Sequence, residues 1–326
     1  MLNFCTLFNS NYAARGLLMY ESLKKTCTDF HLYIFAFDDE LYNYVKKQNL
    51  SHTTIISLAE FEDERLLKVK KERSARAYCW TCESLTIQYC LNHYNIDHCT
   101  YIDADMYFYS NPQVLIDEMG DNDVLLTEHR YTKSENIAYG GRFCVQFMTF
   151  RNTTNGKKVL DWWCDRCLEW CGEDHVNGLF GDQMYLEDWP ERFKSIHILQ
   201  HLGGGVAPWN MQQYEFYKEK SSVRGRKIDD GTLFEVVFFH FHAAKIFYKK
   251  PIVEFFFEGY TIPDTVRKVL QKEYARELCK LAKNISLDNP LNLSIMNVSW
   301  KTFLHRVWKR WKEKDNRYMY VYNGKR

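Results

Sequence analysis

Apolar and polar positions come in alternating blocks along the first hundred residues. Short, nearly continuous apolar runs are typical of strands that are buried on both faces, and longer runs with a helical period separate them. Strands alternating with helices predict a parallel sheet covered by helices, in which ligands bind at the carboxyl ends of the strands. The strands are expected at residues 2–8, 30–37, 53–58 and 99–103, and the helices at 11–25 and 74–94.

The rest of the chain is more mixed. Three glycines at 203–205 indicate a loop where backbone can approach a ligand closely. After about residue 260 the sequence becomes helical, basic and aromatic, which predicts a domain of residues 1–258 followed by a helical extension of residues 259–326. Further strands are expected at 123–127, 143–150 and 233–241, with a helix at 156–171.

Composition narrows the class of protein. The 326 residues are 46% hydrophobic, which is ample for a large core, and the net charge of +1 provides no overall field that would attract nucleic acid. No stretch approaches the roughly 20 apolar residues that span a bilayer, and the start lacks the pattern of a signal peptide. We therefore expect a cytoplasmic protein whose eleven cysteines stay as thiols.

Candidate chemistry begins at Asp103-Ala104-Asp105, which follows the apolar run 99–102. Two carboxylates at the end of a buried strand are costly unless they are paired or bind a metal, and two residues apart on extended chain they point to the same side. Two histidines, His240 and His242, alternate near the end of the later apolar strand, and Lys245 follows them. Mg²⁺ and Mn²⁺ prefer oxygen ligands, and Mn²⁺ also accepts imidazole. We expect His242 as the third ligand, with His240 as the alternative.

At these residues the chain resembles a family. Tyr101-Ile102-Asp103-Ala104-Asp105 is similar to the Asp-x-Asp signature of glycosyltransferases with the GT-A fold, a Rossmann-like α/β fold with a mixed, mostly parallel sheet. Gly181-Asp182-Gln183 and the segment from His240 to Lys245 resemble motifs of retaining family 8 enzymes. Residues 201–210 resemble a segment of bacterial cell-surface polysaccharide transferases. Departures at Cys144-Val145-Gln146 and at Ala243 leave the donor sugar open.

The resemblance implies roles for these positions. The Asp103-Ala104-Asp105 segment and His242 would hold Mn²⁺ or Mg²⁺, which bridges the diphosphate of a nucleotide sugar, expected to be a UDP-sugar. Lys245 would neutralise the leaving diphosphate. Thr6 and Tyr12 would contact the base or ribose. Asp182 and Gln183 would face the reacting sugar carbon, and because Asp182 could also act as a base, retention and inversion both remain open.

The C-terminal part of the sequence predicts a basic amphipathic helix. Within residues 300–314, apolar side chains recur at helical spacing, and lysines and arginines cover the other faces. A basic amphipathic helix with tryptophan on its apolar side suits an anionic membrane, here the inner face of the cytoplasmic membrane, but a helix packed on its own domain gives the same pattern. Its apolar positions are Trp300, Phe303, Leu304, Val307, Trp308 and Trp311.

Three functions follow from these patterns. The first is a metal-dependent glycosyltransferase that acts on a glycan or lipid-linked acceptor in bacterial surface polysaccharide synthesis. The second is a sugar-phosphate nucleotidyltransferase, although residues 9–15 lack the glycine-rich basic loop of that class. The third is a non-catalytic, membrane-surface binding protein on a transferase fold, which the intact Asp103, Asp105, His242 and Lys245 disfavour.

Overall fold

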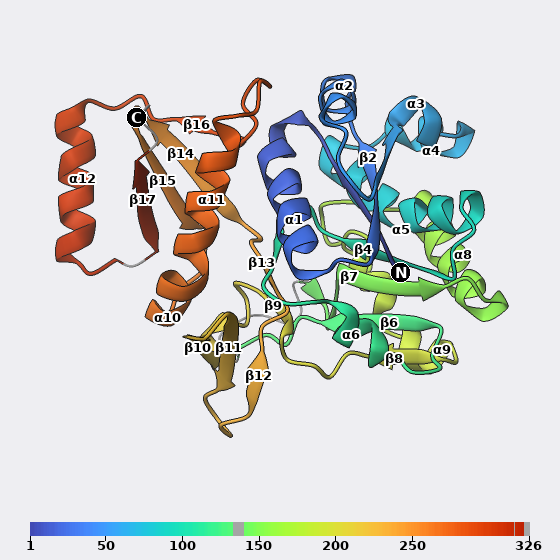
Figure 1. Cartoon of the computed structure of the whole chain (residues 1–326). Coiled ribbons are helices and arrows are strands. Elements are labelled where there is room, and N and C mark those ends of the chain that lie inside the picture. Colours follow the sequence, from blue (N-terminus) through green and yellow to red (C-terminus); the bar gives the residue numbers. More distant parts are fainter. Residues whose placement is uncertain (133–139, 316, 323–326) are drawn as a thin grey trace.

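The computed structural model describes residues 1–132, 140–315 and 317–322, and it places a seven-stranded sheet at the centre of this part of the chain (Figure 1). The strand order is β3-β2-β1-β4-β7-β6-β8, and only β7 runs antiparallel to its neighbours. The strands are β1 (Leu2–Phe8), β2 (Phe30–Ala36), β3 (Thr53–Ser57), β4 (His98–Ile102), β6 (Val124–Glu128), β7 (Phe143–Arg151) and β8 (Ile196–Ile198).

Helices cover both faces of this sheet. Successive side chains of a strand point to opposite faces, and here apolar side chains occur on both of them. On one face, Phe4 and Phe8 of β1 pack with α1 (Ala13–Thr26). On the other face, Cys5 and Leu7 pack with α5 (Ala75–His93) and α8 (Thr154–Glu169). The expected mixed α/β fold is confirmed. Smaller helices are α2 (Asp39–Gln48), α3 (Leu58–Phe61), α4 (Glu64–Lys70), α6 (Gln113–Asp117) and α9 (Trp189–Arg192).

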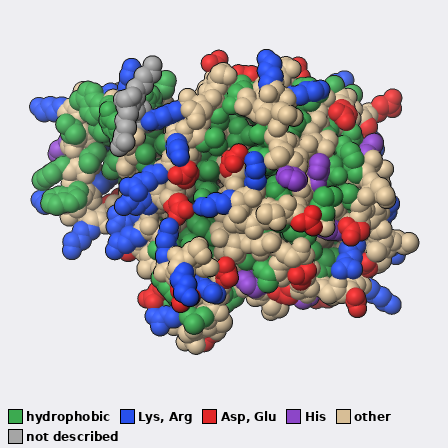
Figure 2. Space-filling view, in the orientation of Figure 1, with side chains coloured by type: hydrophobic (Ala, Val, Ile, Leu, Met, Phe, Trp, Pro, Cys, Tyr) green, Lys and Arg blue, Asp and Glu red, His purple; other side chains and the backbone are tan. Residues whose placement is uncertain are grey.

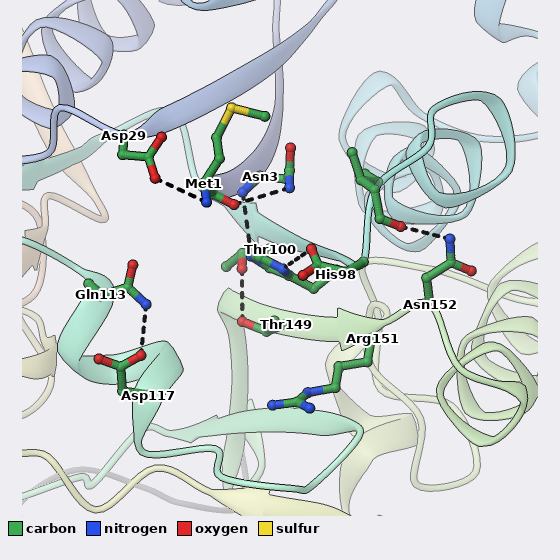
Figure 3. A network of polar contacts seen from close by, with 12 residues as sticks. Met1, Asn3, Asp29, His98, Thr100, Gln113, Asp117, Thr149, Arg151 and Asn152 are labelled. Atoms are coloured by element: carbon green, nitrogen blue, oxygen red, sulfur yellow. Dashed lines mark hydrogen bonds and ion pairs between the residues drawn. The ribbon is translucent and has the colours of Figure 1, made fainter.

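The helices begin where the sequence supplies caps. The side chains of Asp38, Ser74 and Thr153 accept hydrogen bonds from backbone N–H groups at the starts of α2, α5 and α8. Figure 3 shows the end of the sheet at which β1 and β4 begin and β7 ends, with polar contacts between these strands. The hydroxyls of Thr100 on β4 and Thr149 on β7 lie 2.8 Å apart. His98, the first residue of β4, is at the opposite end of that strand from Asp103.

Two small sheets adjoin the central one. In the first, β13 (Phe238–His240) lies between β5 (Met106–Phe108) and β9 (Gly204–Val206). The second contains β10 (Tyr214–Glu219), β11 (Ser222–Lys227) and β12 (Leu233–Glu235). The strand expected at 233–241 is thus two strands in different sheets, and the glycine segment expected as a loop is mostly strand.

Gly203, which precedes β9, shows why that segment is rich in glycine. A Cβ atom at this position would lie 1.8 Å from the carbonyl oxygen of Glu235, so any side chain would push the backbone of β9 away from β13. The glycine therefore permits the close approach that holds β13 in place.

The C-terminal part forms a third unit around a four-stranded sheet of order β16-β14-β15-β17 (Figure 1). The boundary expected at residue 258 falls inside this unit, since β14 and β15 precede it and β16 and β17 follow it. Its apolar core is nevertheless continuous with that of the first domain. The elements are β14 (Ala244–Lys249), β15 (Ile252–Phe257), α10 (Asp264–Val266), the π-helical turn η4 (Arg267–Gln271), α11 (Lys272–Ala282), β16 (Ser294–Ile295), α12 (Trp300–Lys312) and β17 (Tyr318–Tyr322).

The two helices α11 and α12 cover opposite faces of this sheet. Ile246, Val253 and Phe255 are buried in the same core as the inner side of α11. On the other face, the carboxylate of Glu254 is in direct contact with Arg310 of α12 and accepts a hydrogen bond of 3.0 Å from the hydroxyl of Tyr320. Because Glu254 is only 1% exposed, this ion pair fastens α12 to the sheet.

No helix among the described residues combines the length and the apolar character that crossing a bilayer requires.

The ion pair of Glu254 gives a first prediction. Glu254→Ala leaves the partly buried Arg310 without a counter-ion, and we expect it to lower the free energy of unfolding by about 3 kcal/mol. Glu313→Ala is the matched control, because among the described residues Glu313 forms an ion pair only with the exposed Lys309, at 3.8 Å, and should cost less than about 1 kcal/mol. Denaturant unfolding followed by tryptophan fluorescence measures both. Equal midpoints for the two variants would contradict the role assigned to Glu254.

Candidate active site

The site lies where the buried strand β4 ends and the chain turns into β5. The strand ends at Ile102, and the next three residues form a turn in which the N–H of Met106 donates to the carbonyl oxygen of Asp103, at 3.3 Å. The N–H of Asp103 itself donates to the carbonyl oxygen of Gln146 on β7, at 3.2 Å. These bonds fix Asp103 and Asp105 at the carboxyl end of the parallel strands, with side chains that are 23% and 15% exposed.

Strand pairing brings His240 to this turn. In the antiparallel pair of β13 and β5, His240 lies opposite Met106, the residue after Asp105. Its Nε2 atom lies 3.0 Å from Oδ1 of Asp105 and 3.4 Å from Oδ2 of Asp103. Its Nδ1 atom donates a hydrogen bond of 2.8 Å to Oε1 of Gln146. The structure thus brings His240 together with two carboxylates that lie 135 and 137 positions before it in the sequence.

Charge couples these three side chains. Burial disfavours the charged form of His240, but the Asp105 carboxylate and its hydrogen bond raise the pKa of His240 well above its usual value. Burial likewise acts to raise the pKa of Asp105, yet the His240 imidazolium lowers it to about 2. For Asp103 burial prevails, and its pKa is raised. The imidazolium of His240 thus offsets one of the two negative charges that the ionised pair carries.

The same donor atoms fit a divalent metal. One oxygen from each carboxylate and one nitrogen of His240 lie within 4.8 Å of one another. Two carboxylates and an imidazole are a ligand set that Mn²⁺ accepts. The bond from Nδ1 to Gln146 would hold the ring with Nε2 toward the carboxylates, as second-shell partners of metal-bound histidines do. Loss of the Nε2 proton would make that atom a ligand.

His242, the expected third ligand, lies beside this group. Its ring centre is 5.6 Å from that of His240, and burial together with the charge of His240 lowers its pKa to about 4. Among the described residues, the group of possible ligands at Asp103 and Asp105 contains His240 and not His242. Lys245, half exposed on β14, lies 3.3 Å from Glu258 and contributes to the low pKa of His242. It is therefore close enough to act on charge at the site.

The expected nucleotide contacts differ in accessibility. Thr6 on β1 is fully buried, so a nucleotide could reach it only if neighbouring side chains moved. Tyr12, in the 3₁₀ turn η1 (Ser10–Tyr12), is partly exposed, and the guanidinium of Arg15 lies 4.5 Å from its ring centre. Ala104 is buried in the turn between the two carboxylates.

Arg15 is a residue that sequence reasoning missed as part of the site. It is buried in α1, donates a hydrogen bond of 3.0 Å to the carbonyl oxygen of Ala244, and helps to lower the pKa of Asp105. An arginine inside the apolar segment 13–20 is the signal that could have drawn attention to it.

Asp182, an expected catalytic residue, is paired with Glu83, which the sequence analysis did not include in the site. Its side chain is hydrogen-bonded to Glu83 of α5, and both carboxyls are buried. Burial raises the pKa of Asp182 to about 7, and burial and Asp182 raise the pKa of Glu83 well above its usual value. Two buried carboxyls in contact must share a proton. Gln183 follows in the turn η2 (Gln183–Leu186), where its Nε2 donates to the carbonyl oxygen of Gly140, at 2.7 Å.

The segment 201–210 forms a wall of the site. The ring centre of Trp209 lies 5.4 Å from those of both His240 and His242, and its indole N–H is buried without a hydrogen-bond partner among the described residues. Asn210 holds this wall in place, because its Nδ2 donates to the carbonyl oxygens of His129 and Gly205, at 2.8 Å each.

Comparison with known proteins places this geometry in a family. The sequence profile of nucleotide-diphospho-sugar transferases matches residues 28–192. Two uncharacterised proteins of Bacillus subtilis (strain 168) are similar: YfnD is 30% identical over 244 residues, covering 73% of this chain and 76% of YfnD, and YfnF is 28% identical over 253 residues, covering 74% and 82%.

A solved structure shares the fold. The galactosyltransferase LgtC, crystallised with donor and acceptor sugar analogues, superposes with a TM-score of 0.52 at 12% identity, covering 88% of this chain and 97% of LgtC. The GT-A architecture predicted from the sequence is thereby confirmed. Together with the family match over half of its length, this shows that the chain belongs to the nucleotide-diphospho-sugar transferases and is a glycosyltransferase of the GT-A fold.

Proposed function

We propose that this glycosyltransferase is metal-dependent and moves a sugar from a UDP-sugar to a glycan or lipid-linked acceptor in the synthesis of bacterial cell-surface polysaccharide, on the cytoplasmic side of the membrane. The observation that carries the proposal is the convergence of Asp103, Asp105 and His240 at the carboxyl end of β4. A Mn²⁺ or Mg²⁺ ion held there would neutralise negative charge that develops on the leaving diphosphate.

Other residues of the chain would share that task. Two cations are close enough to contribute: the charge of Lys245 acts on His242, and that of the buried Arg15 acts on Asp105. Preorganised positive groups stabilise charge that appears only as the sugar–phosphate bond breaks. Tyr12, whose ring lies beside Arg15, would contact the base or ribose of the nucleotide.

Asp182 and Gln183 would act on the sugar side of the bond. The proton shared with Glu83 allows Asp182 to carry a partial negative charge close to an electron-poor sugar carbon. The same carboxylate could accept the proton of an acceptor hydroxyl in an inverting reaction. The tether to Gly140 limits the orientations of the Gln183 amide.

Contact with the membrane would come from one face of α12. The apolar stripe expected there is split, since Phe303 is buried against the sheet. Four other members remain 43–77% exposed and lie on one side of the helix, with lysines beside them. Such a surface would insert its rings among the headgroups of an anionic bilayer. These exposed side chains are Trp300, Leu304, Trp308 and Trp311.

The metal requirement can be tested by hydrolysis of UDP-sugars with Mn²⁺. Asp103→Asn combined with Asp105→Asn should slow turnover by about 100-fold or more, because the diphosphate loses its counter-charge, and a chelator should do the same to the parent. Asp117→Asn is the control, since that exposed carboxylate accepts a hydrogen bond from Gln113 and is not part of the candidate site (Figure 3). Undiminished turnover in the double variant would refute the proposed site.

The two histidines can be separated by metal affinity. His240→Ala should weaken Mn²⁺ binding more than about tenfold in calorimetry, because it removes a ligand, whereas His242→Ala should change it only slightly. Circular dichroism checks that both variants fold. The opposite order of the two affinities would restore His242 as the ligand.

Membrane contact can be tested by co-sedimentation with phosphatidylglycerol vesicles. Trp308→Ser with Trp311→Ser should weaken binding by about tenfold, because it removes exposed apolar surface from α12. Tyr217→Ser with Leu233→Ser provides the control, because these residues are also exposed but lie on β10 and β12. If both pairs have the same effect, α12 is not the docking surface.

A further inference from the structure

A basic groove lies between α11 and β17, and the residues that line it include none of the candidate active-site residues. It has a volume of about 920 Å³, and no acidic side chain lines it among the described residues. One wall is the segment Tyr318–Tyr322, and the other is the outer side of η4 and α11. Figure 2 shows lysine and arginine side chains gathered over this helix. The cations that line the groove are Arg267, Lys268, Lys272, Arg276, Lys280 and Lys283.

The cations are arranged in a row. Lys272, Arg276 and Lys280 follow at intervals of four residues, so they share one face of α11. Within the described ranges, Lys272, Arg276 and Lys280 form no ion pair. Arg267 and Lys268, in contrast, each have a side-chain nitrogen near a carboxylate oxygen of Asp264, at 3.1 and 3.9 Å. From residue 267 to residue 283 the row extends about 24 Å along the helix. A row of that length is longer than one phosphate or carboxylate needs.

The wall opposite the cations can form hydrogen bonds. β17 pairs with β15 on one side only and is the edge strand of its sheet. Half of its backbone N–H and C=O groups therefore point away from β15, and its five residues line the groove. Cations on one wall and donors and acceptors on the other suit a chain that carries both acidic groups and hydroxyls.

The helix that lines the groove packs, on its other side, toward the candidate active site. The inner side of α11 is buried, and Tyr274 stacks on Phe241 with ring centres 3.5 Å apart. Phe241 lies between His240 and His242, and its N–H donates to the carbonyl oxygen of Asp105, at 2.9 Å. A ligand in the groove would thus lie behind the helix that supports the metal-site strand.

We infer that this groove binds an acidic glycan, a sugar chain bearing phosphate or uronate groups, as an extended part of the acceptor. The inference rests on the proposed glycosyltransferase function and specifies the acceptor class. A flat bilayer would meet the convex tryptophan face of α12 rather than a concave groove, and an extended polyanion matches a linear row of cations. An acidic peptide added to β17 would use the same edge, and the experiment distinguishes it.

Binding of fluorescent oligogalacturonate at low ionic strength tests the inference. Lys272→Glu, Arg276→Glu and Lys280→Glu together should weaken binding by about tenfold or more, because charge-assisted hydrogen bonds are lost. The matched control carries the same change of charge on α12, through Lys301→Glu, Lys309→Glu and Lys312→Glu, and should lose less than about twofold. Neutral dextran should not bind to either protein.

Several results would overturn the inference. Equal losses in the two triple variants would mean that only overall charge matters. Failure of the parent to bind oligogalacturonate, or equally tight binding of polyglutamate, would exclude a glycan site, the latter in favour of an acidic peptide. Greater loss of phosphatidylglycerol vesicle binding in the α11 variant than in the α12 variant would identify a membrane site. UDP-sugar hydrolysis with Mn²⁺ is measured in parallel, and its absence in the parent would instead refute the proposed function.

Discussion

The pairing of β13 with β5 is the contact on which the candidate site depends. It places an imidazole next to two carboxylates that follow a buried strand, at distances of 3.0 and 3.4 Å. Carboxylates at such a position are costly without a compensating charge, so the arrangement is stable only with a proton on His240 or with a cation. The close approach at Gly203 and the turn bonds of Asp103 serve to hold this strand and this turn in register.

The C-terminal unit connects the candidate metal site to the surface of the molecule. Its sheet continues directly from the strand that carries His240, and α11 packs against that strand through Tyr274. One helix of the unit exposes tryptophan, and the other exposes a row of cations beside an edge strand. In this arrangement a nucleotide sugar, an acidic acceptor chain and a membrane would meet three separate surfaces of one molecule.

Local patterns in the sequence predict much of this structure, and long-range pairing decides the rest. The first domain was predictable because strands such as β1 are apolar on both faces and caps such as Ser74 mark helix starts. The carboxylate pair was predictable from the end of β4. The choice between His240 and His242 was not, because both lie at alternate positions and only the register with β5 separates them. Nothing in the sequence indicates that Glu83 belongs to the site, because its partner Asp182 is about 100 residues away.

The central claim is that Asp103, Asp105 and His240 bind one cation that also binds a diphosphate. Pulsed electron paramagnetic resonance on the protein with Mn²⁺ and UDP tests it directly, because the ion reports which nuclei lie next to it. The account predicts couplings to both phosphorus and an imidazole nitrogen, with the nitrogen coupling lost in His240→Gln and kept in His242→Gln. A spectrum without nitrogen coupling, or one whose nitrogen coupling survives in His240→Gln, would contradict it.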